Sequence, residues 1–159
     1  MKKIYFTFLI APFCLLADDH KAQGNSIDWE IEAYTTSAPD FIGNFATVIS
    51  ASGEVLREGS NGWTCLPFIA MPKMGFKTKN EAAPACADQN AMAWANAYLS
   101  QTEPKLENDG WIWMLHGDTG VDNFRPYSEG DEKNTDPKDW IYSGAHLMLM
   151  PKDPNSLGS

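Results

Sequence analysis

Apolar and polar positions follow a helical period in two segments of the chain. Residues 26–36 and 89–101 each repeat apolar side chains every three or four positions, which predicts two amphipathic helices. Asp88 is placed to cap the second helix, and Pro39 and Pro104 follow the two predicted ends. The apolar stripes consist of Ile27, Ile31 and Tyr34 in the first helix and of Met92, Ala95, Tyr98 and Leu99 in the second.

Four other segments have the composition of strands. Residues 45–51 are β-branched and apolar, and residues 54–58 follow after a turn that contains Gly53, so these two segments predict a hairpin. Residues 111–116 are apolar at every position before the histidine, as in a central strand that is buried on both faces. Residues 146–150 supply the last strand of the chain.

These elements predict the fold class. Apolar strands of this length need cover from a second layer, and the helix around Trp94 is the candidate for it. We therefore expect an α+β domain with a small, mostly antiparallel sheet that is covered by one main helix and stapled by one disulfide. A chain of this size fits a single globular domain, which we place at residues 18–159.

The disulfide is predicted from the position of the cysteines. Cys14 falls within the N-terminal apolar run, so Cys65 and Cys86 remain as the two cysteines of the folded part. The segment between them is rich in proline and has little periodicity, and a bridge would tie both of its ends. The alternatives are two free thiols or half of a metal site, although neither cysteine belongs to a Cys-x-x-Cys pair.

The N-terminus has the pattern of a secretory signal. Lys2 and Lys3 precede an uncharged, mostly apolar run that ends at Ala17, so residues 1–17 are predicted to be a signal peptide. Cleavage after Ala22 is the alternative. The apolar run would span only about 21 Å as a helix, less than the roughly 30 Å core of a bilayer, so no transmembrane segment is expected after the signal is removed. A periplasmic or extracellular protein is the expectation.

The charge of the chain limits its partners. The net charge is −9, and loss of Lys2 and Lys3 with the signal would take it to −11. Only Arg57 and Arg125 carry guanidinium groups. Such a surface repels phosphate backbones and anionic membranes, so nucleic acid is excluded as an expected partner.

Two motifs resemble a family. Asn-Gly-Trp-Thr-Cys at residues 61–65 and Ser-Gly-Ala-His-Leu-Met at residues 143–148 are similar to segments of a group of uncharacterised secreted bacterial proteins. The likeness extends from about Tyr34 to the C-terminus and implies no known activity. Members of the group usually carry a neutral residue where His116 stands. They also usually continue beyond the equivalent of Ser159 into another strand with a second histidine, so a C-terminally truncated chain is one alternative.

The sharpest catalytic candidates are His116, Asp118 and His146. His116 and Asp118 follow one predicted strand and His146 opens another, and two histidines with a carboxylate could hold a metal or act as an acid/base pair. The alternative is that His116 marks the exit of its strand and that His146 is a hydrogen-bonded core or edge residue.

Calcium is the candidate cofactor that the acidic stretch after residue 117 suggests. Counted from Asp118 as the first position of a calcium loop, Asp122 and Glu129 fall at ligand positions. Gly120 and Asn123 break the rest of the pattern. Asp118 and Asp122 are therefore metal-ligand candidates, and solvated loop charge is the alternative.

Several tryptophans could form a platform for carbohydrate, because exposed indole rings stack on sugar faces. Alternation along the predicted strand places Trp111 and Trp113 on one face. Burial in the core is the expected role of these tryptophans and of Trp63 and Trp140.

The sequence as a whole favours an exported binding or accessory module, with a metal-assisted or acid/base hydrolase that uses His116, Asp118 and His146 as the alternative.

Overall fold

The computed structural model describes residues 24–120 and 141–157. The predicted signal peptide, the metal candidate Asp122 and Trp140 lie outside the described residues.

Two predicted helices are present, and each begins at a side-chain cap. α1 (Ile27–Thr35) begins after Ser26, whose hydroxyl accepts a hydrogen bond from the backbone N–H of Trp29. α3 (Gln89–Leu99) begins after Asp88, whose carboxylate accepts from the N–H of Ala91. A short helix, α2 (Asp40–Gly43), and the 3-10 turns η1 (Lys79–Ala82) and η3 (Pro154–Leu157) are additional to the prediction.

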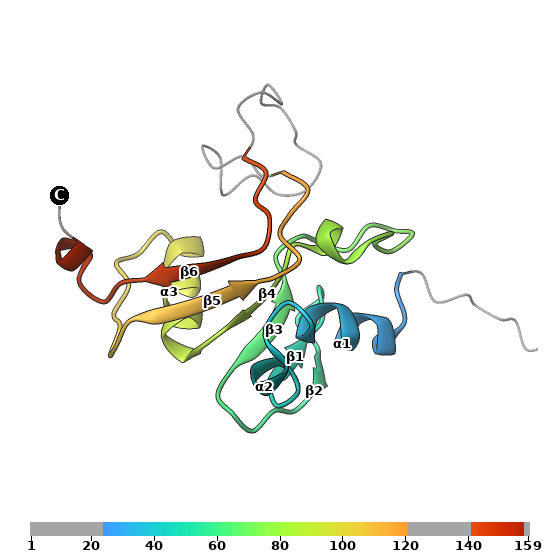
Figure 1. The fold of residues 1–159 in the computed structure, drawn as a ribbon, viewed down its shortest axis with the longest axis horizontal. Coiled ribbons are helices and arrows are strands. Elements are labelled where there is room, and N and C mark those ends of the chain that lie inside the picture. The colour runs from blue at the N-terminus through green and yellow to red at the C-terminus, as the bar shows by residue number, and fades with distance from the viewer. Residues whose placement is uncertain (1–23, 121–140, 158–159) are drawn as a thin grey trace, which may run out of the picture.

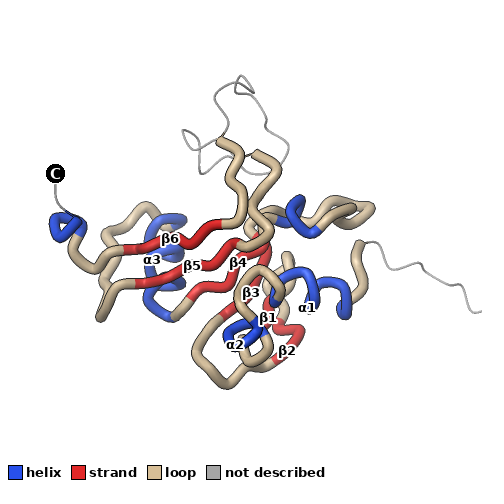
Figure 2. The backbone as a smooth tube through the Cα atoms, in the orientation of Figure 1, coloured by secondary structure: helices blue, strands red, loops and turns tan. Residues whose placement is uncertain are grey.

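Six strands form one sheet with the order β2-β1-β3-β4-β5-β6 (Figures 1 and 2). Within residues 24–120 and 141–157, only β1 and β3 pair in parallel, and every other neighbouring pair is antiparallel. The strands are β1 (Thr47–Ile49), β2 (Val55–Arg57), β3 (Thr64–Pro67), β4 (Pro84–Ala87), β5 (Gly110–Met114) and β6 (His146–Met150). The predicted α+β class, the mostly antiparallel sheet and the hairpin of β1 and β2 are confirmed.

The two faces of the sheet are covered at opposite ends. α1 and α2 pack on one face over β1, β3 and β4, and α3 packs on the other face behind β5 and β6 (Figure 1). We call these the α1 face and the α3 face. Strand alternation and the register place Val48, Cys65, Cys86 and Trp113 on the α1 face, and Ala85, Ala87, Ile112 and Met114 on the α3 face.

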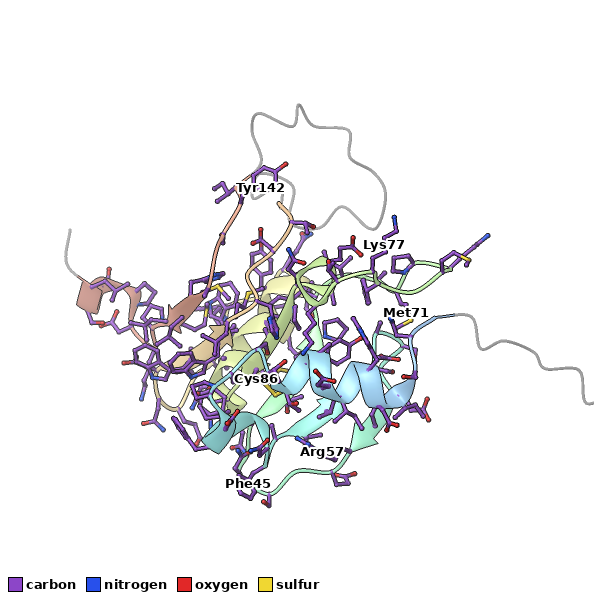
Figure 3. The ribbon with its side chains drawn as sticks, turned by 45° about the vertical axis from the view of Figure 1, so that its right-hand side comes forward. Phe45, Arg57, Met71, Lys77, Cys86 and Tyr142 are labelled. Atoms are coloured by element: carbon purple, nitrogen blue, oxygen red, sulfur yellow. A yellow bond between two sulfur atoms is a disulfide. The ribbon has the colours of Figure 1, made fainter. Side chains whose placement is uncertain are left out.

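The Cys65–Cys86 disulfide lies inside the cluster under α1 (Figure 3). The two cysteines stand opposite each other in the β3–β4 ladder, and both are fully buried. The bond closes a loop with a sequence separation of 21 and therefore restricts the unfolded chain. The predicted bridge across the proline-rich segment is confirmed.

The prediction for β5 is wrong in one respect. The strand was expected to be buried on both faces, but Trp111 is 40% exposed. The physical reason is that α3 covers only one face at this end of the sheet, while α1 and α2 lie over the strands at the other end.

Candidate functional site

His116 lies in the turn after β5 and contacts the end of α1. Its Nε2 is 2.8 Å from the hydroxyl oxygen of Thr36, and the Lys79 ammonium donates to the same hydroxyl at 3.3 Å. Partial burial lowers the pKa of His116, and the positive charge of Lys79 lowers it further. The ring is therefore neutral at pH 7 and could accept a proton.

Asp118 joins the segments that follow β5 and precede β6. One of its carboxylate oxygens accepts from the backbone N–H groups of Gly120 at 2.9 Å and Ser143 at 3.1 Å. The Asp118 N–H donates in turn to the Ser143 carbonyl at 3.0 Å. These contacts give Asp118 a structural role at this junction.

His146 opens β6 and stands opposite Met114. Its Nδ1 donates a hydrogen bond to the carbonyl of Gly144 at 2.6 Å, so this contact engages Nδ1.

The three catalytic candidates lie near one another in sequence and sheet, because His116 and Asp118 follow the end of β5 and His146 is the first residue of β6. Each of their side chains, however, makes its hydrogen bonds with a different group. Among the described residues, no hydrogen bond or ion pair joins His116, Asp118 and His146 to one another. Within residues 24–120 and 141–157, no group of three or more histidine, cysteine or acidic side chains is arranged to hold a metal ion.

An apolar patch lies on the α1 face where no helix covers β5 and β6. It consists of Trp111, Trp113, Leu147 and Leu149, and the register places Trp111 opposite Leu149 and Trp113 opposite Leu147. Trp111 is 40% exposed and Leu147 is 43% exposed, while the other two are half-buried. Trp113 packs at the border of the cluster under α1. The expectation that Trp111 is a core residue is therefore wrong.

The outer edge of β6, the last strand of the sheet, borders this patch. Asp88 N–H donates to the Trp111 carbonyl, and Trp111 N–H donates to the Asp88 carboxylate, so the backbone groups of Trp111 point toward β4. Those of Ile112 then point toward β6, where they meet Met148. The N–H and C=O groups of Leu147 and Leu149 consequently point away from the sheet, and no residue in the described part of the chain bonds to them.

A third feature, an open groove of about 350 Å³, lies at the end of α3. The rings of Trp94 and Tyr98 stack in it with centroids 5.0 Å apart. Its lining residues are Trp94, Tyr98, Gln101, Thr102 and Pro104. Trp94 and Tyr98 stand four positions apart, a spacing that brings two side chains together on one side of a helix. The sequence pattern places Tyr98 in the apolar stripe of this helix and does not identify a groove.

The chain has no significant match to a protein-family model, to a curated protein or to a solved structure. No helix within residues 24–120 and 141–157 has the length and apolar character needed to cross a membrane.

Proposed function

We propose that this chain is an exported binding or accessory module, and that it binds through the apolar patch and the adjoining edge of β6. The observation that carries the proposal is the exposure of Trp111 and Leu147 on a strand pair whose other face is covered by α3. A monomeric protein rarely leaves neighbouring large apolar side chains in water unless they contact a partner. Tryptophan is also among the residues that contribute most to binding energy at interfaces.

Three features support export. The N-terminal basic and apolar pattern has the form of a signal, a disulfide is stable in an oxidising compartment, and the acidic surface suits a soluble exported chain. If the chain is exported, the recovered protein should begin at Asp18 or Gln23 and should contain no free thiol. Intact Met1 on protein recovered outside the cytoplasm would contradict this part of the proposal.

The binding role is tested with a matched pair of variants. Trp111→Ser removes an exposed ring of the patch, whereas Ile112→Ser removes a neighbouring side chain that α3 buries. We expect Trp111→Ser to leave the melting temperature within a few degrees and to abolish capture of a partner from the exported fraction. We expect Ile112→Ser to unfold the protein. If Trp111→Ser captures the same partner as the wild type, the patch is not the binding surface.

A hydrolase that uses His116, Asp118 and His146 is the second candidate. It is favoured by the bond between Asp118 and the Ser143 backbone, which brings the segments that carry the two histidines together, and by the lowered pKa of His116. Hydrolysis of a broad panel of ester, peptide and glycoside substrates, lost in His146→Gln, would support this candidate. Equal turnover by His146→Gln would contradict it.

A further inference from the structure

The two edges of the sheet differ in how they are protected. β2 is three residues long, its pairing with β1 contains an irregularity, and Arg57 folds its guanidinium back onto the carbonyls of Gly43 and Ala46. Short length, irregular pairing and a charged side chain are the devices by which proteins keep an edge from pairing with another chain. β6 is five residues long, regular in register, and contains no acidic residue, lysine or arginine.

We propose that two copies of this chain pair along β6, antiparallel and about a twofold axis at Met148, so that their sheets form one continuous sheet. The inference rests on the proposed binding role of the apolar patch and names a second copy as the partner that its edge accepts.

The outward backbone groups of β6 determine the register. In the pairing centred on Met148, Leu147 stands opposite the partner's Leu149, and Leu149 stands opposite the partner's Leu147. Each opposing pair exchanges two N–H···O=C bonds, so all the outward groups of Leu147 and Leu149 are used. Pro151 lacks an N–H and ends the ladder on one side, and the bend at Ala145 ends it on the other.

The side chains of β6 are self-complementary in this register. On the α1 face, the leucines of the two copies meet and join the two apolar patches across the axis. On the α3 face, Met148 meets its own equivalent, and His146 faces the partner's Met150, a sulfur–aromatic contact. A twofold contact requires this kind of match of a surface with itself.

Charge distinguishes this pairing from nonspecific association. The full chain has a net charge of −9, and each exported copy without Lys2 and Lys3 has −11, yet the five residues of β6 place no acidic side chain against another. The copies therefore repel at long range and match at short range. Sodium chloride screens the long-range repulsion, so it should strengthen the dimer.

Sedimentation of the oxidised exported protein tests the proposal. We expect twice the monomer mass at about 100 µM, and a lower dissociation constant at high salt. Leu149→Pro removes one outward N–H from each copy without removing a bond to β5, and should raise the dissociation constant by about tenfold or more. Val55→Pro, at the other edge, is the control and should leave the mass unchanged.

Hydrogen exchange gives a second measurement that needs no variant. The amides of Leu147 and Leu149 should become protected as the concentration rises, whereas the amide of Met148, bonded to β5, should be protected at every concentration. A monomer at about 100 µM, rapid exchange at Leu147 and Leu149 at every concentration, or a dimer that Leu149→Pro leaves unaffected would overturn the proposal. Trp111→Ser leaves the outward backbone groups of β6 in place. Loss of partner capture by this variant therefore tests the binding role of the apolar patch separately from the pairing of two copies along β6.

Discussion

The two ends of the sheet are stabilised by different means. At the α1 end, the core contains a disulfide, the buried ring of Tyr34 and the hydrogen bond from its hydroxyl to Glu30. At the α3 end, the core consists of alanines, methionines and Ile112, and α3 approaches the sheet so closely that a Cβ added at Gly110 would collide with the backbone of Ala91. One end is joined by a covalent bond and large side chains, and the other by the close approach of two backbones.

β4 belongs to both ends and explains how they are joined. All its residues are buried, because α1 packs over Cys86 on one face and α3 packs near Ala85 and Ala87 on the other. Small side chains are needed where helices approach both faces of one strand. Each end therefore has one covered face and one open face, and the open face of the α3 end carries the apolar patch.

Removal of the disulfide should change the relative stability of the two ends of the sheet more than any of the single substitutions below. The double variant Cys65→Ala and Cys86→Ala removes a constraint on the unfolded chain. It should lower the free energy of unfolding by about 3 kcal/mol and the melting temperature by roughly 10 °C. Exchange of amides around Val48 should rise more than exchange around Ile112, because the bond lies in the α1 end. Reduction of the wild type is the control and should give the same loss. An unchanged melting temperature would show that the α1 end does not depend on the bond.

Much of this architecture could be predicted from the sequence, and the failures have physical causes. α1, α3 and the β1–β2 hairpin follow from local periodicity and from turn residues at Gly53. β4 was missed because its sequence, Pro-Ala-Cys-Ala, has low strand propensity, and only the two covering helices make these small residues suitable. The parallel pairing of β1 with β3 is a long-range arrangement that no local pattern contains.

The candidate site was predicted less well. The positions of His116 and His146 at strand ends were expected, but periodicity cannot show that His116 turns toward Thr36 while His146 bonds to Gly144. The exposure of Trp111 depends on which face α3 covers. A continuous apolar strand has the same sequence pattern whether one face or both faces are covered, so the sequence could not predict this exposure.

The next largest effect should come from Gly110→Ala, which tests the close approach at the α3 end. A Cβ at this position would lie 2.4 Å from the backbone nitrogen of Ala91, so α3 would have to move away from β5. We expect a loss of about 1–3 kcal/mol in the free energy of unfolding, measured by denaturant titration. Gly144→Ala is the matched control, because nothing lies within 4 Å of its added Cβ. Equal stabilities of the two variants would contradict the close approach.

Tyr34→Phe should have a moderate effect confined to the α1 end. It removes the buried hydrogen bond of 2.9 Å to Glu30 and should cost about 1–2 kcal/mol at pH 7. Burial, and then the hydrogen bond and charge of Glu30, raise the pKa of Tyr34 above its ordinary value. Its contribution is therefore complete below about pH 10 and falls at higher pH, where the unfolded state ionises first.

The difference between the wild type and Tyr34→Phe should accordingly shrink above about pH 10. Unfolding by denaturant at neutral and alkaline pH measures it. Tyr142→Phe, at an exposed ring, is the control and should change the stability little at either pH (Figure 3). A constant difference across the pH range would show that Tyr34 is not buried as described.

The smallest effect concerns His116, which lies where the two ends meet. Its turn follows β5 of the α3 end, while its ring contacts Thr36 beside α1. Burial and Lys79 lower the pKa of His116 below 6.5, so the unfolded state takes up a proton first as the pH falls. The contribution of the neutral ring is thus complete above about pH 6.5 and is lost below it. His116→Gln, which keeps a hydrogen-bonding group near Thr36, should lose less stability between neutral and acidic pH than the wild type. The difference should stay below about 1 kcal/mol, because the ring is half-exposed and water screens its charge.

Lys79→Gln separates the two causes of the lowered pKa of His116, which are burial and the charge of Lys79. It should raise the pKa of His116 in an NMR titration but leave it below the ordinary value, because burial is the larger cause. A pKa at the ordinary histidine value in the wild type would mean that the two ends do not enclose this ring.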